Sequence, residues 1–270
     1  MGFRSIAKEI ACSMPFVAAL NAVARWPPGR ALLNQISRPR GVYADFRDAW
    51  AAAGHGHYAG HDHSDSVKTH LALAARLRPS DYAALYWMSQ VEQPQIRIFD
   101  FGGNIGNLFY SYLPYLSRRF TRITWTVMDL PLVCREGRRI ARERRAANLT
   151  FTESAEDAEG CDVLLVSGSL HYWERPLGEF LAQFRRALPR ILVNRTPTQN
   201  EGSSFVTVQT AGTYAVPCIV RNETEMATEF ARCGFRLADQ WKAAELSLRL
   251  PLFPSKTVRM YSGFYFVRAN

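Results

Sequence analysis

From residue 95 onward, short runs rich in β-forming residues alternate with stretches of helical periodicity. The strand-like runs cover 96–100, 124–129, 149–152, 163–167 and 191–194, and the helical stretches between them cover 105–120, 132–147 and 177–188. Strands that alternate with helices form βαβ units, which assemble into a parallel sheet. The alternation therefore predicts an α/β fold.

The C-terminal part of the chain continues this pattern with a change of direction. Asn222 and Glu225 have the spacing of a capping box, and the helix that they begin is expected to end at Gly234. The strands expected after this helix, at 235–243 and 258–267, predict an antiparallel hairpin at the edge of a mostly parallel sheet.

The N-terminal third lacks the strand alternation. Apolar residues such as Phe16, Leu20 and Val23 recur at helical spacing. We therefore expect two regions: a helical extension or cap at 1–90, and a Rossmann-like catalytic domain at 91–270. The cap would lie over a ligand pocket, and a homodimer contact through it is left open.

The composition is that of an ordinary globular protein. The chain has 270 residues, of which 47% are hydrophobic, so it can bury a core without metal or disulfides. Its five cysteines are widely spaced and include no C-x-x-C pair, which is typical of reduced thiols in the cytoplasm. No apolar run reaches the roughly 18 residues of a membrane span, and the N-terminus only weakly resembles a secretory signal. We expect a cytoplasmic protein with no stable membrane span.

The positive charge of the chain is partly local. The net charge is +9, and residues 118–145 contain nine arginines against three acidic residues. Such a stretch could attract nucleic acid or anionic lipid. No aromatic interleaving and no nucleic-acid motif accompany it, so an arginine-rich, solvated helix face is the favoured interpretation. We expect no nucleic-acid partner.

The most informative motif follows the first strand of the alternating region. The strand ends at Asp100, and Gly102, Asn104 and Gly106 follow at positions where a tight turn needs glycine or a residue that tolerates positive φ. The pattern differs from the G-x-G-x-x-G loop that presents a helix N-terminus to a pyrophosphate. An acid at the strand end would repel a pyrophosphate but could receive a cationic ligand. S-adenosylmethionine carries an ammonium and a sulfonium and no phosphate, and the loop resembles motif I of Rossmann-like methyltransferases. The alternative is a purely structural turn.

A second acid supports this interpretation. Asp129 ends the next strand, 23 residues after Gly106, at the spacing of acids that accept hydrogen bonds from ribose hydroxyls. The residues expected to hold the cofactor all follow the ends of the first four strands. They are Asp100, Gly102, Gly103, Asn104, Gly106, Asp129, Leu130, Glu153, Ser154, Ser167, Gly168 and Ser169.

The segment after the fourth strand carries the candidate chemistry. His171 follows the break at Gly168, and its unperturbed pKa near neutrality suits a general base. Two alternatives stay open: His171 is a structural histidine, or it only positions the acceptor, because proximity and desolvation supply much of the acceleration of a methyl transfer.

Two short motifs resemble small-molecule O-methyltransferases. Met128-Asp129-Leu130-Pro131 is similar to the D-L-P that ends their second strand, and Leu170-His171-Tyr172-Trp173 is similar to their H-D-W element. In that family the histidine deprotonates the acceptor hydroxyl. The chain departs from the pattern at Tyr172, which replaces the acid.

A closer resemblance covers roughly residues 40–268. It is to a family of bacterial methyltransferases, mostly named by similarity, that are often associated with surface-polysaccharide gene clusters. The motifs that carry it are Asp100-Phe101-Gly102-Gly103-Asn104-Ile105-Gly106, Ser167-Gly168-Ser169-Leu170-His171-Tyr172, Asn194-Arg195-Thr196-Pro197 and Tyr261-Ser262-Gly263-Phe264-Tyr265-Phe266. The resemblance implies a class I methyltransferase fold and S-adenosylmethionine as cofactor, with S-adenosylhomocysteine as its product. It barely constrains the acceptor.

We therefore expect O-methylation of a small-molecule, sugar or glycan hydroxyl in a bacterial biosynthetic pathway. A catalytically inactive module that binds the cofactor is the alternative, and an NAD-dependent reductase is disfavoured by the acid before Gly102. Arg195 could bind a carboxylate or phosphate of the acceptor, or it could form a surface ion pair. The residues expected to contact the acceptor are Tyr58, Tyr172, Arg195, Gln209 and Tyr214.

A histidine-rich segment leaves a metal site to consider. His55, His57, His61 and His63 lie close together in the sequence, with Asp62 and Asp65 beside them. Short His-rich tracts can bind metals. The glycines among the histidines indicate a flexible loop rather than a fixed ligand frame, so we favour a lid that faces the substrate and expect no metal.

Overall fold

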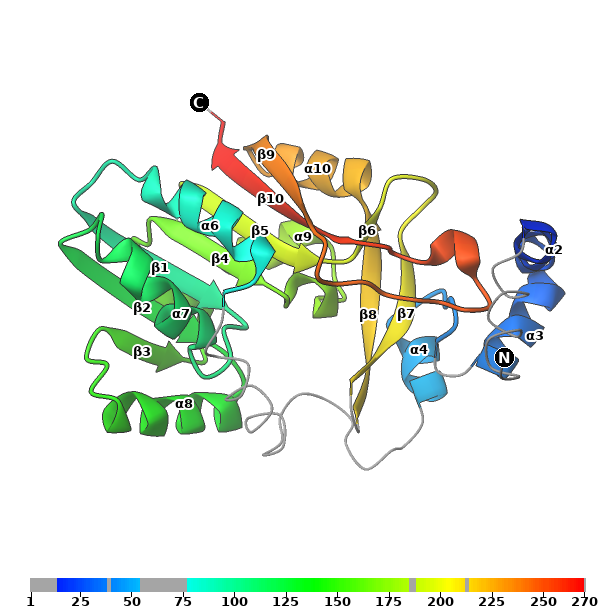
Figure 1. Ribbon diagram of the computed structural model, residues 1–270, viewed down its shortest axis with the longest axis horizontal. Helices are drawn as coiled ribbons and strands as arrows, with labels where there is room; N and C mark the ends of the chain where they lie inside the picture. Colours follow the sequence, from blue (N-terminus) through cyan, green and yellow to red (C-terminus); the bar gives the residue numbers. More distant parts are fainter. Residues whose placement is uncertain (1–13, 38–39, 54–76, 185–187, 212–213, 270) are drawn as a thin grey trace, which may run out of the picture.

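A seven-stranded sheet with the order β3-β2-β1-β4-β5-β10-β9 forms the main body of the molecule (Figure 1). The structure is a computed structural model that describes residues 14–37, 40–53, 77–184, 188–211 and 214–269. The strands of the main sheet are β1 (Gln95–Phe101), β2 (Arg122–Met128), β3 (Leu149–Thr152), β4 (Val163–Ser167), β5 (Arg190–Thr196), β9 (Phe235–Ala243) and β10 (Tyr261–Arg268).

The strand directions confirm the predicted fold class. The pairings from β3 through β5 are parallel, whereas β10 is antiparallel to both β5 and β9. The order 3-2-1-4-5 is that of a doubly wound sheet, in which the order reverses between β1 and β4. The result is the mostly parallel, Rossmann-like sheet expected for a class I methyltransferase. The expected antiparallel pair is present at one edge of the sheet, where β10 pairs with β5 and β9 is the outermost strand.

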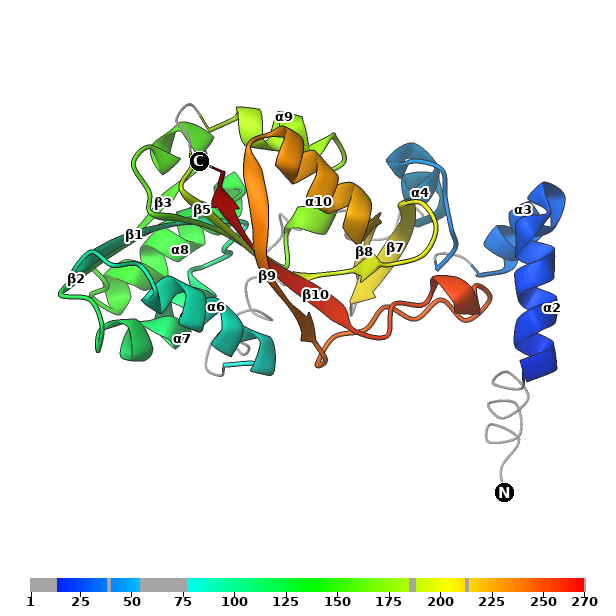
Figure 2. The same ribbon diagram turned by 90° about the horizontal axis from the view of Figure 1, so that it is seen from above.

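Helices cover both faces of this sheet (Figure 2). Neighbouring residues on β1 point to opposite faces, so Ile98 joins one buried cluster with α6 and α7, and Phe99 joins the other with α9 and α10. Both clusters are almost wholly apolar. The helices are α6 (Pro79–Ser89), α7 (Asn107–Leu116), α8 (Pro131–Glu143), α9 (Leu177–Ala182) and α10 (Glu223–Arg232), with short 3₁₀ turns η1 (Ala155–Ala158), η2 (Leu170–Tyr172) and η3 (Pro254–Lys256).

A second, three-stranded sheet extends from the end of β5. Its order is β6-β8-β7, with β7 and β8 antiparallel. Residues before α6 pack on this sheet: Tyr43 forms an antiparallel bridge with Val206, and the Thr207 hydroxyl donates to the Gly41 carbonyl at 2.7 Å. The elements are β6 (Thr198–Gln199), β7 (Phe205–Ala211), β8 (Tyr214–Asn222), α2 (Met14–Arg25), α3 (Pro27–Ser37) and α4 (Phe46–Ala53).

The N-terminal helices are therefore associated with the second sheet rather than with the main one. Phe46 and Ala49 of α4 pack against Val206 and Val208 of β7. Helices α2 and α3 lie at the end of the molecule remote from β1–β3 (Figures 1 and 2). Helix α6, in contrast, packs on the main sheet. No helix among the described residues is long and apolar enough to cross a membrane.

A glycine on α8 provides a test of how closely the helix packs on the main sheet. Gly137 is buried, and a Cβ added there would lie 2.5 Å from Cζ of Phe151 on β3. We expect overpacking in Gly137→Ala to cost about 1–3 kcal/mol. After the gain of about 1 kcal/mol in helix propensity, the protein should be destabilised by up to about 2 kcal/mol. Urea denaturation measures the difference.

Gly178 on α9 is the matched control for this substitution. The nearest atom to a Cβ there would be Sγ of Cys233 at 3.8 Å, an ordinary contact. Gly178→Ala should leave the free energy of unfolding unchanged or raise it slightly. Equal effects of the two substitutions would contradict the close packing of α8 on β3.

Candidate functional site

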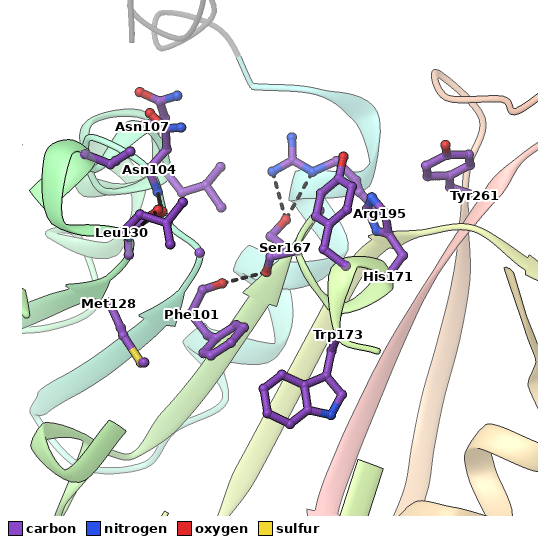
Figure 3. Close-up of a pocket in the computed structure, with 18 of the residues that line it drawn as sticks. Phe101, Asn104, Asn107, Met128, Leu130, Ser167, His171, Trp173, Arg195 and Tyr261 are labelled. Carbon is purple, nitrogen blue, oxygen red and sulfur yellow. Dashed lines mark hydrogen bonds between the residues drawn. The ribbon is translucent and has the colours of Figure 1, made fainter. Parts of the chain in front are cut away.

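A cavity of about 770 Å³ opens at the carboxyl ends of the parallel strands, where the strand order reverses. Ligands of open α/β sheets bind at this place. Figure 3 shows Asn104, Asn107 and Leu130 on one side of the cavity and His171 and Tyr261 on the other, with Ser167 between them. Of the predicted site residues, those that line it are Gly102, Gly103, Asn104, Asp129, Leu130, Glu153, Ser167, Gly168, Ser169, His171, Tyr172, Arg195 and Gln209.

The loop after β1 adopts the backbone conformation that its sequence requires. Gly102, Asn104 and Gly106 have φ values of 69°, 56° and 85°. Asn104 is the only one with a side chain, and asparagine tolerates this region better than most residues. Its Oδ1 accepts a hydrogen bond from the amide of Ile105 at 2.8 Å. The turn thereby brings its backbone to the cavity wall.

Asp100 lies beneath this loop rather than in the cavity. A Cβ at Gly103 would lie 2.9 Å from Oδ1 of Asp100, so only glycine lets the loop pass over the carboxyl group. The carboxyl group is fully buried, and its Oδ2 accepts from Nε1 of Trp125 at 3.1 Å. Its Oδ1 has no hydrogen-bond partner among the described residues. Burial raises the pKa of Asp100 from 3.8 to about 7.

Asp129 ties the loop to the end of β2. Its Oδ2 accepts from the amide of Asn104 and its Oδ1 accepts from the amide of Leu130, both at 2.8 Å. Each carboxylate oxygen can accept more than one hydrogen bond, so Asp129 can also receive hydroxyl groups from the cavity that it lines.

Two of the predicted cofactor residues support the walls without lining the cavity. Gly106 is the N-cap of α7 and lies close to the side chain of Leu149. Ser154 is the N-cap of η1, where its hydroxyl accepts from the amide of Glu156 at 3.2 Å. Glu153, which precedes Ser154 in the chain, does line the cavity.

The ends of β1, β4 and β5 are joined by hydroxyl groups (Figure 3). Ser169 donates from Oγ to the carbonyl of Phe101 at 2.6 Å. Ser167 accepts from Nε and Nη2 of Arg195 at 3.1 and 2.9 Å. These hydrogen bonds hold the ends of the three strands together at the base of the cavity, between its two sides.

Aromatic side chains form the side of the cavity that lies opposite Asp129. His171 is only 3% exposed, and its ring centroid lies 4.1 Å from that of Tyr172 and 6.2 Å from that of Tyr261. The hydroxyl of Tyr172 donates to Oε1 of Gln209 on β7 at 2.7 Å. The second sheet therefore completes the wall opposite Asp129.

Arg195 is a buried cation in the cavity wall. Its φ is 55°, and its own amide donates to Oδ1 of Asn194 at 3.0 Å. Its Nη2 lies 3.3 Å from Oδ1 of Asp81, which also accepts from the hydroxyl of Tyr112 at 2.8 Å. The ion pair that the sequence left as an alternative is thus present, but it is buried rather than on the surface.

Some expected residues fall outside the described part of the chain. Tyr58 and the segment His55–His63 lie there, and of Tyr214 only the backbone, at the start of β8, is described. Among the described residues, no three His, Cys, Asp or Glu side chains are grouped as metal ligands would be. Residues 14–37 and 40–53 contribute no residue to the cavity, so the cap over the pocket stays a prediction.

The cavity also includes residues that sequence reasoning did not select. Arg78 and Asp81 come from the start of α6, and Asn107 from the start of α7. The sequence feature that could have identified these three residues is a polar side chain beside a predicted helix start. The other lining residues that were not predicted are Phe101, Leu108, Ser111, Met128, Pro131, Val133, Trp173, Leu246 and Tyr261.

Comparisons with known proteins find similar folds. No protein-family model matches the chain, and no curated protein sequence matches it. The chain aligns with the 1,6-didemethyltoxoflavin N1-methyltransferase of Burkholderia thailandensis over 72% of this chain and 80% of that one, at 17% identity and a TM-score of 0.47. With the magnesium protoporphyrin IX methyltransferase of Synechocystis PCC 6803 it shares 14% identity over 75% of this chain and 83% of that one, at a TM-score of 0.44.

A third similar structure is mitomycin 7-O-methyltransferase, at 20% identity and a TM-score of 0.44. The alignment covers 76% of this chain but only 55% of that protein, so the chain spans just over half of its length. At these identities the likeness concerns the fold alone.

The buried carboxyl group of Asp100 predicts a pH dependence of stability. Its pKa is about 7 in the folded chain and close to the ordinary value of 3.8 in the unfolded chain. At a pH between these two pKa values, the folded chain keeps a proton on Asp100 that the unfolded chain has lost. The contribution of Asp100 to stability is therefore fully present near pH 4 and below, and is lost as the pH rises to about 7. Asp100→Asn removes this pH dependence, because its amide is neutral at every pH in this range.

Denaturation of both proteins across this pH range measures the effect. The free energy of unfolding of Asp100→Asn should increase relative to the wild type from about pH 4 to about pH 7 and then level off. A difference that is independent of pH would contradict the raised pKa.

Proposed function

We propose that the chain is an S-adenosylmethionine-dependent methyltransferase that methylates a hydroxyl group of a small molecule or sugar. The observation that carries this proposal is the carboxylate of Asp129, which lines the cavity at the end of β2 while holding the backbone of the loop after β1. An acid in this position accepts hydrogen bonds from ribose hydroxyls.

The residues of the cavity fit this cofactor. Asp129 can accept hydrogen bonds from the ribose, and Leu130, Met128 and Val133 offer apolar surface to the adenine. Oδ1 of Asn107, a buried atom without a hydrogen-bond partner among the described residues, can accept from an ammonium group or a hydroxyl. The volume of about 770 Å³ is within the range of small-molecule sites. When bound, the cofactor supplies an electrophilic methyl group.

The loop after β1 disfavours an NAD-dependent reductase. A dinucleotide needs a place for its pyrophosphate at this loop, close to the start of α7. The loop reads Gly102-Gly103-Asn104-Ile105-Gly106-Asn107, so asparagines stand where the dinucleotide motif G-x-G-x-x-G has its second and third glycines.

We propose that the acceptor hydroxyl binds on the aromatic side, beside His171. The protein can bring the acceptor close to the methyl group and exclude water, and His171 can take the hydroxyl proton. The hydrogen bond between Tyr172 and Gln209 fixes the aromatic wall that holds the acceptor. The family resemblance supports a bacterial glycan or a glycan precursor as the acceptor, and a cytoplasmic site of action.

Calorimetry tests the cofactor. S-adenosylhomocysteine should bind to the wild type, and Asp129→Ala should weaken binding about 10- to 100-fold, because hydrogen bonds to a charged group and the anchor of the loop are lost. Asp162→Ala is the control, since Asp162 accepts from the amide of Arg97 near the amino ends of β1 and β4 and does not line the cavity. Saturable binding of NAD with no binding of the adenosyl ligand would overturn the proposal.

Turnover tests catalysis and separates an enzyme from an inactive module. With an acceptor that supports release of S-adenosylhomocysteine, His171→Ala should lower kcat about 10²- to 10⁴-fold and leave cofactor affinity nearly unchanged. His171→Gln keeps hydrogen bonding but not basicity, so it should be nearly as slow. A wild-type kcat in His171→Gln would show that the histidine only positions the acceptor.

A further inference from the structure

Arg78 places a partly buried guanidinium group at the cavity. It immediately precedes α6, is about half-buried and lines the wall. Its amide donates to Oδ2 of Asp81 at 2.8 Å, but its guanidinium forms no hydrogen bond or ion pair with another described residue. Burial, and then the charge of Arg195, lower the pKa of Arg78, and the nearby carboxylates of Asp81 and Glu245 offset part of this shift. The N–H groups of the guanidinium lie at the cavity and can donate to an anionic ligand.

Arg195, the second arginine of this wall, is already balanced and held in place. Asp81 neutralises its charge, and Ser167 accepts from both Nε and Nη2. The hydrogen bonds between described residues leave Nη1 of Arg195 unused. A guanidinium edge that is fixed in this way is suited to a planar carboxylate.

The position of the two arginines relative to Asp129 indicates where such a carboxylate would come from. Asp129 follows β2, and Ser167, which holds Arg195, ends β4, with β1 between these strands. Adjacent strands are about 4.8 Å apart, so the two sites are separated by about 10 Å. A ribose bound at Asp129 would let its amino-acid arm extend across the end of β1 to Arg195.

We infer that Arg78 and the free edge of Arg195 form a carboxylate-binding site, whose first candidate ligand is the aminoacyl carboxylate of the cofactor and whose second is a carboxylate on the acceptor. This inference rests on the proposed function. Asp81 is a positioning residue, because its carboxylate pairs with Nη2 of Arg195 and its Oδ2 accepts from the amide of Arg78.

The test compares two nucleosides that differ in the carboxylate. S-adenosylhomocysteine has the amino-acid arm, whereas 5′-methylthioadenosine has the same adenosine and sulfur without it. Calorimetry with both ligands is carried out on the wild type, Arg78→Met and Arg78→Lys. Arg135→Met is the charge-matched control, because Arg135 is exposed on α8 and does not line the cavity.

If the carboxylate is that of the cofactor, Arg78→Met should weaken binding of S-adenosylhomocysteine about 10- to 100-fold and leave methylthioadenosine unchanged. Arg78→Lys keeps the charge and should recover part of the loss. Arg135→Met should bind both ligands like the wild type. The selective loss separates a contact with the carboxylate from general damage to the cavity.

If the carboxylate is that of the acceptor, Arg78→Met should bind both nucleosides normally. Salicylate should then bind to the wild-type complex with S-adenosylhomocysteine better than neutral salicylamide does, and Arg78→Met should lose this preference. Unchanged nucleoside binding without any preference for salicylate would overturn the inference and leave the proposed function intact. Failure of both nucleosides to bind to the wild type would overturn both.

Discussion

The carboxylate of Asp129 is the interaction on which the site depends. It accepts the amide of Asn104 from the loop after β1 and the amide of Leu130 at the start of α8, so one side chain joins two consecutive βα connections. This hydrogen bond helps to hold Asn104 at its positive φ, and such conformations persist only where the surroundings impose them. The same carboxylate faces the cavity, which links the stability of the loop to the recognition of a ligand.

Charge is divided between two parts of the cavity wall. Asp129 and Glu153 follow β2 and β3, whereas Arg78 and Arg195 lie beside the ends of β4 and β5. A ligand with hydroxyl groups at one end and a carboxylate at the other is complementary to this arrangement. The aromatic side chains around His171 extend the cavity beyond both groups toward the second sheet. The site is thus built from residues that the doubly wound order brings together from distant parts of the chain.

The main sheet was predictable because each of its first five strands is an apolar run bounded by acids, glycines or polar residues. β8 was not predicted: Pro217 interrupts its pattern, and the strand tolerates it because β6 pairs only with Arg221 and Asn222, so no described strand flanks Pro217 on that side. The sequence also indicates which residues follow strand ends, but not which face the cavity. Asp100 supports the loop from below, and Arg78 reaches the site only because α6 packs on the sheet, which is a long-range contact.

A crystal structure of the chain with S-adenosylhomocysteine tests the role of Asp129 most directly. We expect the ribose hydroxyls within hydrogen-bond distance of Asp129, the adenine against Leu130, and the amino-acid arm over the loop formed by Gly102 and Gly103. Density for the ligand at any other place, or a ribose directed away from Asp129, would show that this carboxylate shapes the loop without recognising the cofactor.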